Sequence, residues 1–206
     1  AKAMKNGWMF GIPLQNRVSF GYLYNSSISH LENIKNEMDK DLVDYGKTKN
    51  VKNIDFKNYY SKDNFTDGRI VRNGNASFFL EPMEATSLAS AIYISQWAYD
   101  IWEEGYSPKS RQIAYDTYFK DVESMISMHY LAPKHLKSKF WKLARKKAKN
   151  HLPTSTFYFK NIATTNNEED FDLDKYKDDV GTWGVRSYIE NINGLNIRKD
   201  LNKLLK

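Results

Sequence analysis

The spacing of the apolar residues changes near residue 85, and this change restricts the possible fold more than any other feature of the chain. Before it, aromatic and β-branched residues alternate with polar ones, as in Trp8, Phe10 and Ile12, which is typical of half-buried strands. After it, apolar residues recur every three or four positions, as in helices packed on a core. We therefore predict an α+β fold, with antiparallel strands in a first part, 1–85, and a helical second part, 86–206.

The strand pattern predicts a strand pair over 8–24, in which Pro13 lies between the two runs and turns the chain. Two further strands are expected over 54–60 and 68–79, separated by a polar turn.

Helix signals give approximate bounds for the rest of the chain. Ser29 and Glu32 form a capping-box pattern, Thr86 is a suitable helix cap and Gly105 a helix stop. A loop is expected over the polar and acidic stretch 153–180. The expected helices cover 29–44, 86–104, 107–132, a basic segment ending near 150, and 185–203.

Composition excludes several classes of protein. The 206 residues contain 31 Lys and Arg against 25 Asp and Glu, which is a smaller basic excess than a dedicated nucleic-acid binder carries. The absence of cysteine excludes disulfides and thiolate zinc sites from this stretch. No apolar run approaches the roughly 20 residues of a membrane helix. We expect a globular, cytoplasmic protein that does not associate with membranes.

The segment 74–87, with the sequence GNASFFLEPMEATS, places a strand end, a tight turn and a helix start within fourteen residues. A helix start offers unpaired N–H groups and a positive dipole end, which together can hold a small anion such as a halide. Glu84 in the same turn supplies a carboxylate for proton transfer. The alternative is an ordinary strand-to-helix connection with a solvated glutamate.

Aromatic residues form two further motifs. The sequence GWMFGIP over 7–13 places Trp8 and Phe10 on one strand face, and His129-Tyr130 is followed by Phe140-Trp141. Flat aromatic walls suit an indole or phenol ring. The alternative is that these side chains belong to the core.

In order and spacing, these motifs resemble those of the flavin-dependent halogenases of the tryptophan-halogenase family, over roughly Trp8 to Trp141. The resemblance implies that Glu84 is the catalytic carboxylate and that Thr86 and Ser87 bind the halide. It also implies flavin contacts for three residues of the preceding turn, Gly74, Asn75 and Ala76.

The same resemblance assigns the aromatic motifs. His129, Tyr130, Phe140 and Trp141 would line the pocket for the aromatic substrate. The signature motif, Trp8, Phe10, Ile12 and Pro13, would keep that substrate away from the flavin. Three residues depart from the family pattern, namely Phe10 for a second Trp, Asn75 for the Asp of related flavoproteins, and Ser87 for the Gly often found there.

The family's reaction requires reduced FAD, oxygen, a halide and a flavin reductase that supplies FADH2. The 206 residues contain no G-x-G-x-x-G after a strand and no match to the segment with the family's catalytic lysine. We therefore expect the FAD-binding portion to lie upstream in the same protein. The strand-rich part would complete its flavin and substrate sheet, and the helical part would lie on the substrate side. The isolated chain is expected to be inactive and to bind FAD weakly.

Two other functions stay open. A flavin monooxygenase of the same superfamily is favoured by Phe10, and a helical interaction or nucleic-acid module by the basic run between Lys134 and Lys149. Metal binding is not expected. The aspartates at 170, 172 and 174 imitate the start of an EF-hand loop, but Lys175 and Gly181 stand where its turn glycine and bidentate glutamate belong.

Overall fold

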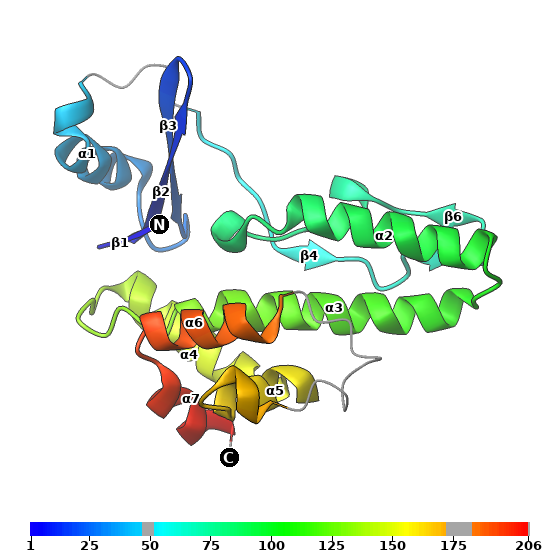
Figure 1. Ribbon diagram of the computed structural model, residues 1–206. Coiled ribbons are helices and arrows are strands. Elements are labelled where there is room, and N and C mark those ends of the chain that lie inside the picture. The colour runs from blue at the N-terminus through cyan, green and yellow to red at the C-terminus, as the bar shows by residue number, and fades with distance from the viewer. Residues whose placement is uncertain (47–51, 172–182, 206) are drawn as a thin grey trace. The chain divides into compact units, whose positions relative to one another are not determined.

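The computed structural model describes residues 1–46, 52–171 and 183–205, which form two compact units. The smaller unit contains 1–55 and 130–149, and the larger contains 56–129 and 150–206. Antiparallel strands dominate the first part of the chain and helices the second, which confirms the α+β prediction (Figure 1). Within the described ranges, no helix has both the length and the apolarity to cross a membrane. The functional division expected at residue 85 stays a prediction.

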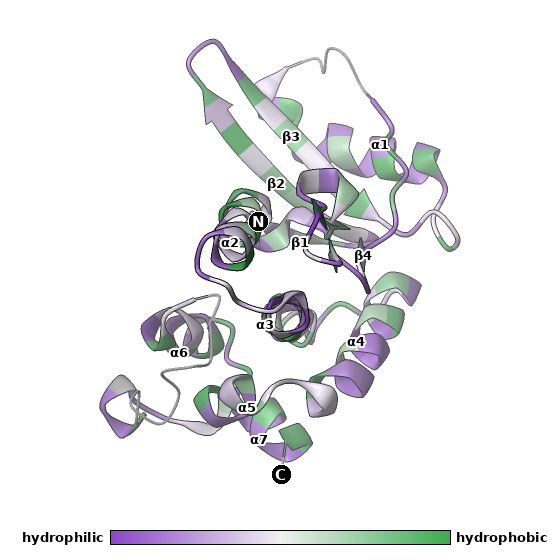
Figure 2. Ribbon diagram, turned by 90° about the vertical axis from the view of Figure 1, so that its right-hand side faces the viewer, coloured by the Kyte–Doolittle hydropathy of each residue, from purple (hydrophilic) through white to green (hydrophobic). Residues whose placement is uncertain are grey.

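The smaller unit is built on a three-stranded antiparallel sheet in the order β1-β2-β3. Its strands are β1 (Lys2–Met4), β2 (Gly7–Leu14) and β3 (Arg17–Tyr24). Met4 and Met9 pack with Leu42 in a small core. Hydrophobic and hydrophilic residues mix along the β2–β3 hairpin (Figure 2), and the side chains of its far end, including Ile12 and Val18, are exposed.

The strand pair over 8–24 is confirmed, but the predicted role of Pro13 is wrong. Pro13 lies inside β2, opposite Val18, and the chain turns at residues 15 and 16. Because β1 pairs only with Gly7–Met9, one edge of β2 is open at Pro13, where a missing N–H group is tolerated.

The first helix, α1 (Leu31–Asp41), is shorter than predicted and is followed by a 3₁₀ turn, η1 (Val43–Tyr45). The predicted capping box is wrong. His30, not Ser29, is the N-cap residue, and no side chain caps the helix. Ser29 is instead buried in the preceding turn, where its amide donates to the carbonyl of Asn25 over 3.0 Å.

In the larger unit, the two predicted long strands are wrong in extent. Four two-residue strands replace them, paired as β4 with β7 and β5 with β6. The strand prediction rested on aromatic residues, and these residues pack against helices instead of forming long strands. Phe65, for example, meets the rings of Trp97 and Tyr115 edge to face. The four strands are β4 (Tyr59–Tyr60), β5 (Phe65–Thr66), β6 (Ile70–Val71) and β7 (Phe78–Phe79).

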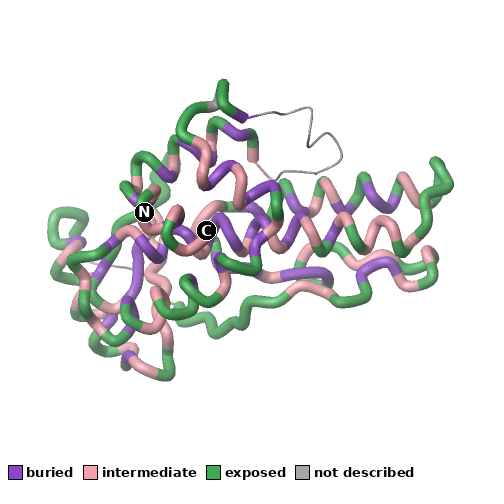
Figure 3. Tube along the Cα trace, turned by 90° about the horizontal axis from the view of Figure 1, so that it is seen from below, coloured by how far each residue is buried: buried purple, intermediate pink, exposed green. Residues whose placement is uncertain are grey.

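Two long helices, α2 (Ser87–Trp102) and α3 (Pro108–His129), confirm the helical spacing and lie side by side (Figure 1). A buried hydrogen bond of 3.1 Å joins Ser90 to Tyr118 across them. The core around α3 is aromatic, with Tyr115, Tyr118 and Phe119 fully buried. Buried stretches alternate with exposed ones along the helices (Figure 3).

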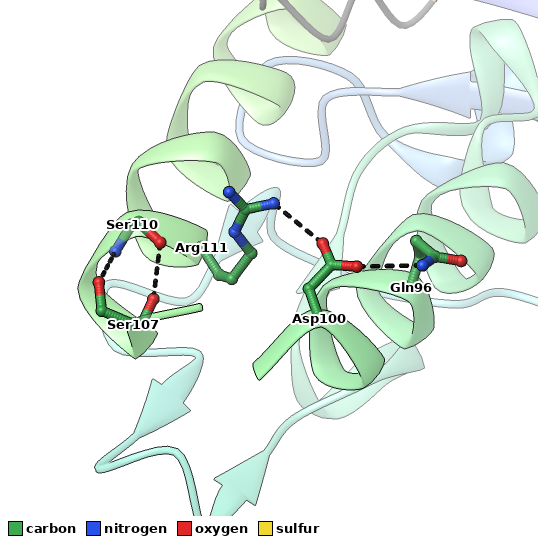
Figure 4. Close-up of polar contacts among 5 residues, drawn as sticks. All are labelled: Gln96, Asp100, Ser107, Ser110 and Arg111. Atoms are coloured by element: carbon green, nitrogen blue, oxygen red, sulfur yellow. Dashed lines mark hydrogen bonds and ion pairs between the residues drawn. The ribbon is translucent and has the colours of Figure 1, made fainter. Parts of the chain in front are cut away.

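An ion pair joins the end of α2 to the start of α3 (Figure 4). Arg111 lies 2.9 Å from Asp100, whose other carboxylate oxygen accepts from Gln96 over 3.0 Å. The Arg111 guanidinium also stacks on Tyr106, 4.2 Å from the ring centre. Both charged side chains are largely buried, so removing either one would leave the other as an uncompensated charge.

The basic helix is confirmed as α4 (Lys139–His151), which buries Phe140, Trp141 and Ala148 and exposes Lys142, Lys146 and other lysines. The exposed lysines agree with a solvated helix face rather than requiring a nucleic-acid partner.

The loop predicted over 153–180 is partly wrong, because it contains 3₁₀ turns and a helix, α5 (Phe157–Thr164). The Thr156 hydroxyl caps α5 by accepting from the Phe159 amide over 3.1 Å. The helix expected over 185–203 is two helices, α6 (Val185–Gly194) and α7 (Arg198–Leu205). Left-handed backbone at Asn196, with φ of 52°, separates them. The 3₁₀ turns are η4 (Leu152–Thr154) and η5 (Glu168–Asp170).

Candidate functional site

The turn between β7 and α2 carries the predicted catalytic glutamate. Pro82 begins a 3₁₀ turn, η3 (Pro82–Glu84), because proline tolerates the first helical position. Ala85 then adopts a left-handed conformation, with φ of 50° and ψ of 34°. Thr86 returns to right-handed backbone, and α2 begins at Ser87. The predicted strand end, turn and helix start are therefore all present.

The amides at the start of α2 fit an anion. A left-handed residue followed by a right-handed one turns successive N–H groups toward one side, an arrangement that binds anions. The Ala85 amide donates to the Pro82 carbonyl, whereas the amides of Thr86 and Ser87 have no acceptor among the residues described. The start of α2 adds the positive end of its dipole.

The prediction that the Thr86 side chain caps α2 is wrong. The structure shows no side-chain cap on this helix, and Thr86 is buried with helical backbone angles of −73° and −13°. An N-cap side chain accepts from the first helix amides when its own backbone is extended, which is not the case here. Those amides are thus not used by the Thr86 hydroxyl.

Glu84 pairs with His129, the last residue of α3. Its Oε1 lies 2.9 Å from Nε2 of His129, and the side chains of Glu84 and His129 are only 19% and 13% exposed. In the sequence, these two residues belong to separate motifs, with the predicted roles of catalytic carboxylate and substrate wall. The structure brings them together.

A contact that the sequence motifs did not indicate holds the His129 ring. Its Nδ1 lies 2.8 Å from the Met125 carbonyl one turn earlier. Burial lowers the pKa of His129, but the bond and charge of Glu84, with Met125 and Asn191, raise it above its usual value overall. Only the four-residue spacing of Met125 and His129 could have been found in the sequence.

The predicted flavin-contact residues form a 3₁₀ turn, η2 (Gly74–Ala76), which is largely exposed. Gly74 is left-handed, with φ of 53°, and a Cβ built there meets nothing within 4 Å. Glycine is thus favoured here by its backbone angle, and the space beside it is open. Tyr59 donates a hydrogen bond to the Asn75 carbonyl.

A buried polar network anchors this turn. The Ser77 hydroxyl donates to Asn64 Oδ1 over 2.7 Å and lies 2.9 Å from the Tyr115 hydroxyl. Tyr115 also bonds the Ser61 amide and the Ser77 carbonyl. Because Ser77, Asn64 and Tyr115 are fully buried, the network fixes η2 to α3.

Tyr130, Phe140 and Trp141 lie in the smaller unit, where they pack together with Trp8. The Trp8 indole donates to the Tyr130 hydroxyl over 3.2 Å, and the Trp141 indole donates to the Met4 carbonyl over 2.6 Å. Ring centres of Tyr130 and Trp141 are 5.9 Å apart, and those of Phe140 and Trp141 are 5.2 Å apart. All four are buried, so in this structure they are core side chains.

The signature motif divides between core and surface. Trp8 is buried, and Phe10 is partly buried with its ring centre 5.7 Å from that of Trp8. Ile12 and Pro13 are exposed. Contact of these residues with a substrate stays a prediction.

No set of three or more potential metal ligands occurs in the part of the chain that the structure describes. Asp172, Asp174, Lys175 and Gly181, which entered the rejected EF-hand hypothesis, lie outside that part.

Three solved structures are similar to the chain in fold. MibH, a lanthipeptide tryptophan 5-halogenase, matches with a TM-score of 0.73 and 16% sequence identity. VirX1 matches with a TM-score of 0.67 and 21% identity. A tryptophan halogenase from Shewanella frigidimarina matches with a TM-score of 0.66 and 18% identity. Each match covers 98% of this chain but only 41%, 43% and 41% of the respective structure. The chain thus spans less than half the length of these proteins.

Among curated proteins, none matches the chain. Its sequence does match the tryptophan halogenase family, over residues 1–199. This match covers nearly the whole chain and includes all three motifs. It also agrees with the similarity in fold. The chain belongs to the tryptophan halogenase family.

Proposed function

We propose that this chain is the C-terminal part of a FADH2-dependent halogenase that halogenates an indole- or phenol-like ring, using halide and oxygen. Glu84 is the catalytic carboxylate in this proposal, and the amides of Thr86 and Ser87 bind the halide. One observation carries it. A carboxylate lies two residues before amides that have no acceptor among the described residues, on a turn shaped for anions.

The residues of the chain fit the groups that the reaction requires. A halide fits the two amides because it is a small anion that needs donors and not a specific geometry. The open backbone at Gly74, with Asn75 and Ala76, fits contact with a flavin edge. FAD, when bound, supplies the oxygen chemistry. The chain contributes the anion site and a carboxylate that accepts a proton.

The remaining parts of the reaction belong to the rest of the protein. The similar structures are more than twice as long as the part that this chain matches. We propose that an N-terminal portion binds FAD, that a flavin reductase supplies FADH2, and that the enzyme works in the cytoplasm. Reduced FAD, bromide and indole added to the isolated chain are expected to give no brominated product. Brominated indole would contradict this division of roles.

Glu84→Gln in the complete protein tests the catalytic role. Loss of the carboxylate should lower the rate of halogenation by about a hundredfold or more, because a positioned acid–base group contributes at least that much. FAD binding should be unchanged. Glu103→Gln, just beyond the other end of α2, is the matched control and should keep wild-type activity. Full halogenation by Glu84→Gln would exclude Glu84 as the catalytic group.

A flavin monooxygenase of the same superfamily is the second candidate, and Phe10 in place of the family's second Trp favours it. The two functions differ in their products. The halogenase incorporates bromine from bromide into the ring, whereas a monooxygenase adds oxygen and is indifferent to bromide. Mass spectrometry of the product with and without bromide therefore separates them.

A further inference from the structure

Both ring nitrogens of His129 face oxygen atoms. Nδ1 lies 2.8 Å from the Met125 carbonyl, and Nε2 lies 2.9 Å from Oε1 of Glu84. A carbonyl oxygen can only accept, so Nδ1 carries a hydrogen. The contact between Nε2 and a carboxyl oxygen then needs a second hydrogen between them. The pair is thus an imidazolium with a carboxylate, or a neutral ring with a carboxylic acid.

The surroundings favour the imidazolium and the carboxylate. His129 faces Glu84 from the turn before α2, Met125 from its own helix and Asn191 from α6, and of these only Glu84 is titratable. Burial opposes the charge on the ring, but the carboxylate and the two neutral groups outweigh it and raise the pKa of His129.

The contact also orders the Glu84 side chain. Oε1 is engaged by the ring, while Oε2 has no hydrogen-bond partner in the part of the chain that is described. A free glutamate side chain samples many rotamers, and fixing one before the reaction removes that entropic cost from the barrier. The ring is itself held at Nδ1 by the Met125 carbonyl, so it is a rigid support.

We propose that His129 is a positioning residue for Glu84: its Nε2 holds Oε1 and so orients the carboxyl group, with Oε2 left to accept a proton. This role rests on the proposed catalytic function of Glu84. Substrate contact by His129 stays a separate prediction, and Met125 gains a supporting role that its sequence position alone does not indicate.

The direct test is an NMR pH titration of the histidine rings in the 206-residue chain. His129 should stay protonated above the ordinary value of about 6.5, with both ring nitrogens bearing hydrogen. In Glu84→Gln, burial acts without the opposing charge, so the pKa of His129 should fall below that value. Glu103→Gln should leave it unchanged. An unchanged His129 titration in a folded Glu84→Gln chain would overturn the proposal.

Graded variants of the complete protein add a kinetic readout. His129→Gln keeps a neutral donor and His129→Ala removes it, so kcat should fall from wild type to Gln to Ala, by up to about a hundredfold. The KM for the aromatic substrate should change little. Both variants lack the titratable ring of His129, so the pH profile of kcat should change in the same way in each of them. Equal kcat in the Gln and Ala variants, or a loss seen only as KM, would overturn the positioning role.

The two proposals fail in different ways. If Glu84→Gln abolishes halogenation but leaves the His129 titration unchanged, the proposed function holds and the role of His129 does not. If the titration shifts while Glu84→Gln retains halogenation, the pair exists but the catalytic assignment is wrong.

Discussion

The charge of His129 gives the fold a pH dependence whose direction follows from its contacts. The pKa of His129 is raised in the folded chain, because Glu84, Met125 and Asn191 outweigh the effect of burial. A raised pKa stabilises the fold fully below the unfolded value of about 6.5, and this contribution is lost as the pH rises through the folded pKa.

Urea denaturation at several pH values measures this contribution. The free energy of unfolding should fall as the pH rises above about 6.5, and it should fall more steeply in the wild-type chain than in Glu84→Gln. Glu103→Gln should follow the wild type. If Glu84→Gln shows the same slope as the wild type, the ion pair does not contribute to stability in this pH range.

Tyr115 offers a second test at the residue scale, because its hydroxyl meets two buried polar groups of Ser77 and the part-buried amide of Ser61. Tyr115→Phe leaves them without that partner and should cost about 1–3 kcal/mol of unfolding free energy. Tyr99→Phe, at an exposed position of α2, should change it by less than about 0.5 kcal/mol. Similar losses in both variants, measured by denaturation, would contradict the network's role.

Sequence alone could identify Glu84 as a candidate but not its partner. Glu84 belongs to a contiguous motif with a helix start, and such a motif is visible in the sequence. His129 lies far along the chain, and its pairing depends on how α3 packs on the turn before α2. No periodicity encodes such a contact. Sequence alone also left open whether the aromatic residues of the later motifs line a pocket or a core, since core and pocket aromatics look alike in a sequence.

At the scale of elements, α2 separates buried from exposed positions within three residues. Ile94 is fully buried and Ile92 is 62% exposed. Ile94→Ala should lower the unfolding free energy by about 2–5 kcal/mol, because it removes buried methyl groups and leaves a cavity. Ile92→Ala should change it by less than about 0.5 kcal/mol. Equal effects in thermal or chemical denaturation would show that the face of α2 is wrongly assigned.

The helices were more predictable than the strands. Apolar residues recur every three or four positions over many turns, and this spacing predicted the bounds of α2, α3 and α4 closely. The strands over 54–60 and 68–79 were overpredicted, because aromatic residues that favour strands also fill the core beside α3. α5 was missed because acidic residues follow it, although Thr156 with Phe159 and Ile162 carries a cap and an apolar spacing.

At the scale of the whole molecule, the fold class was predictable because strands and helices are segregated along the chain. The two compact units were not, since each is assembled from two separate segments of the sequence. Assembly of this kind depends on contacts between distant residues, which composition and local spacing do not report. The family match and the similar structures supply the remaining context: the chain belongs to the tryptophan halogenase family and spans less than half the length of the structures that it resembles.

Bromide binding tests the central claim most directly, because that claim places a halide on the amides of Thr86 and Ser87 beside Glu84. Crystals of the complete protein soaked in bromide and measured at the bromine absorption edge would locate the ion by anomalous scattering. The account predicts a bromide within hydrogen-bonding distance of both amides. Protein oxygen atoms bonded to those amides, or bromide bound only elsewhere, would contradict it.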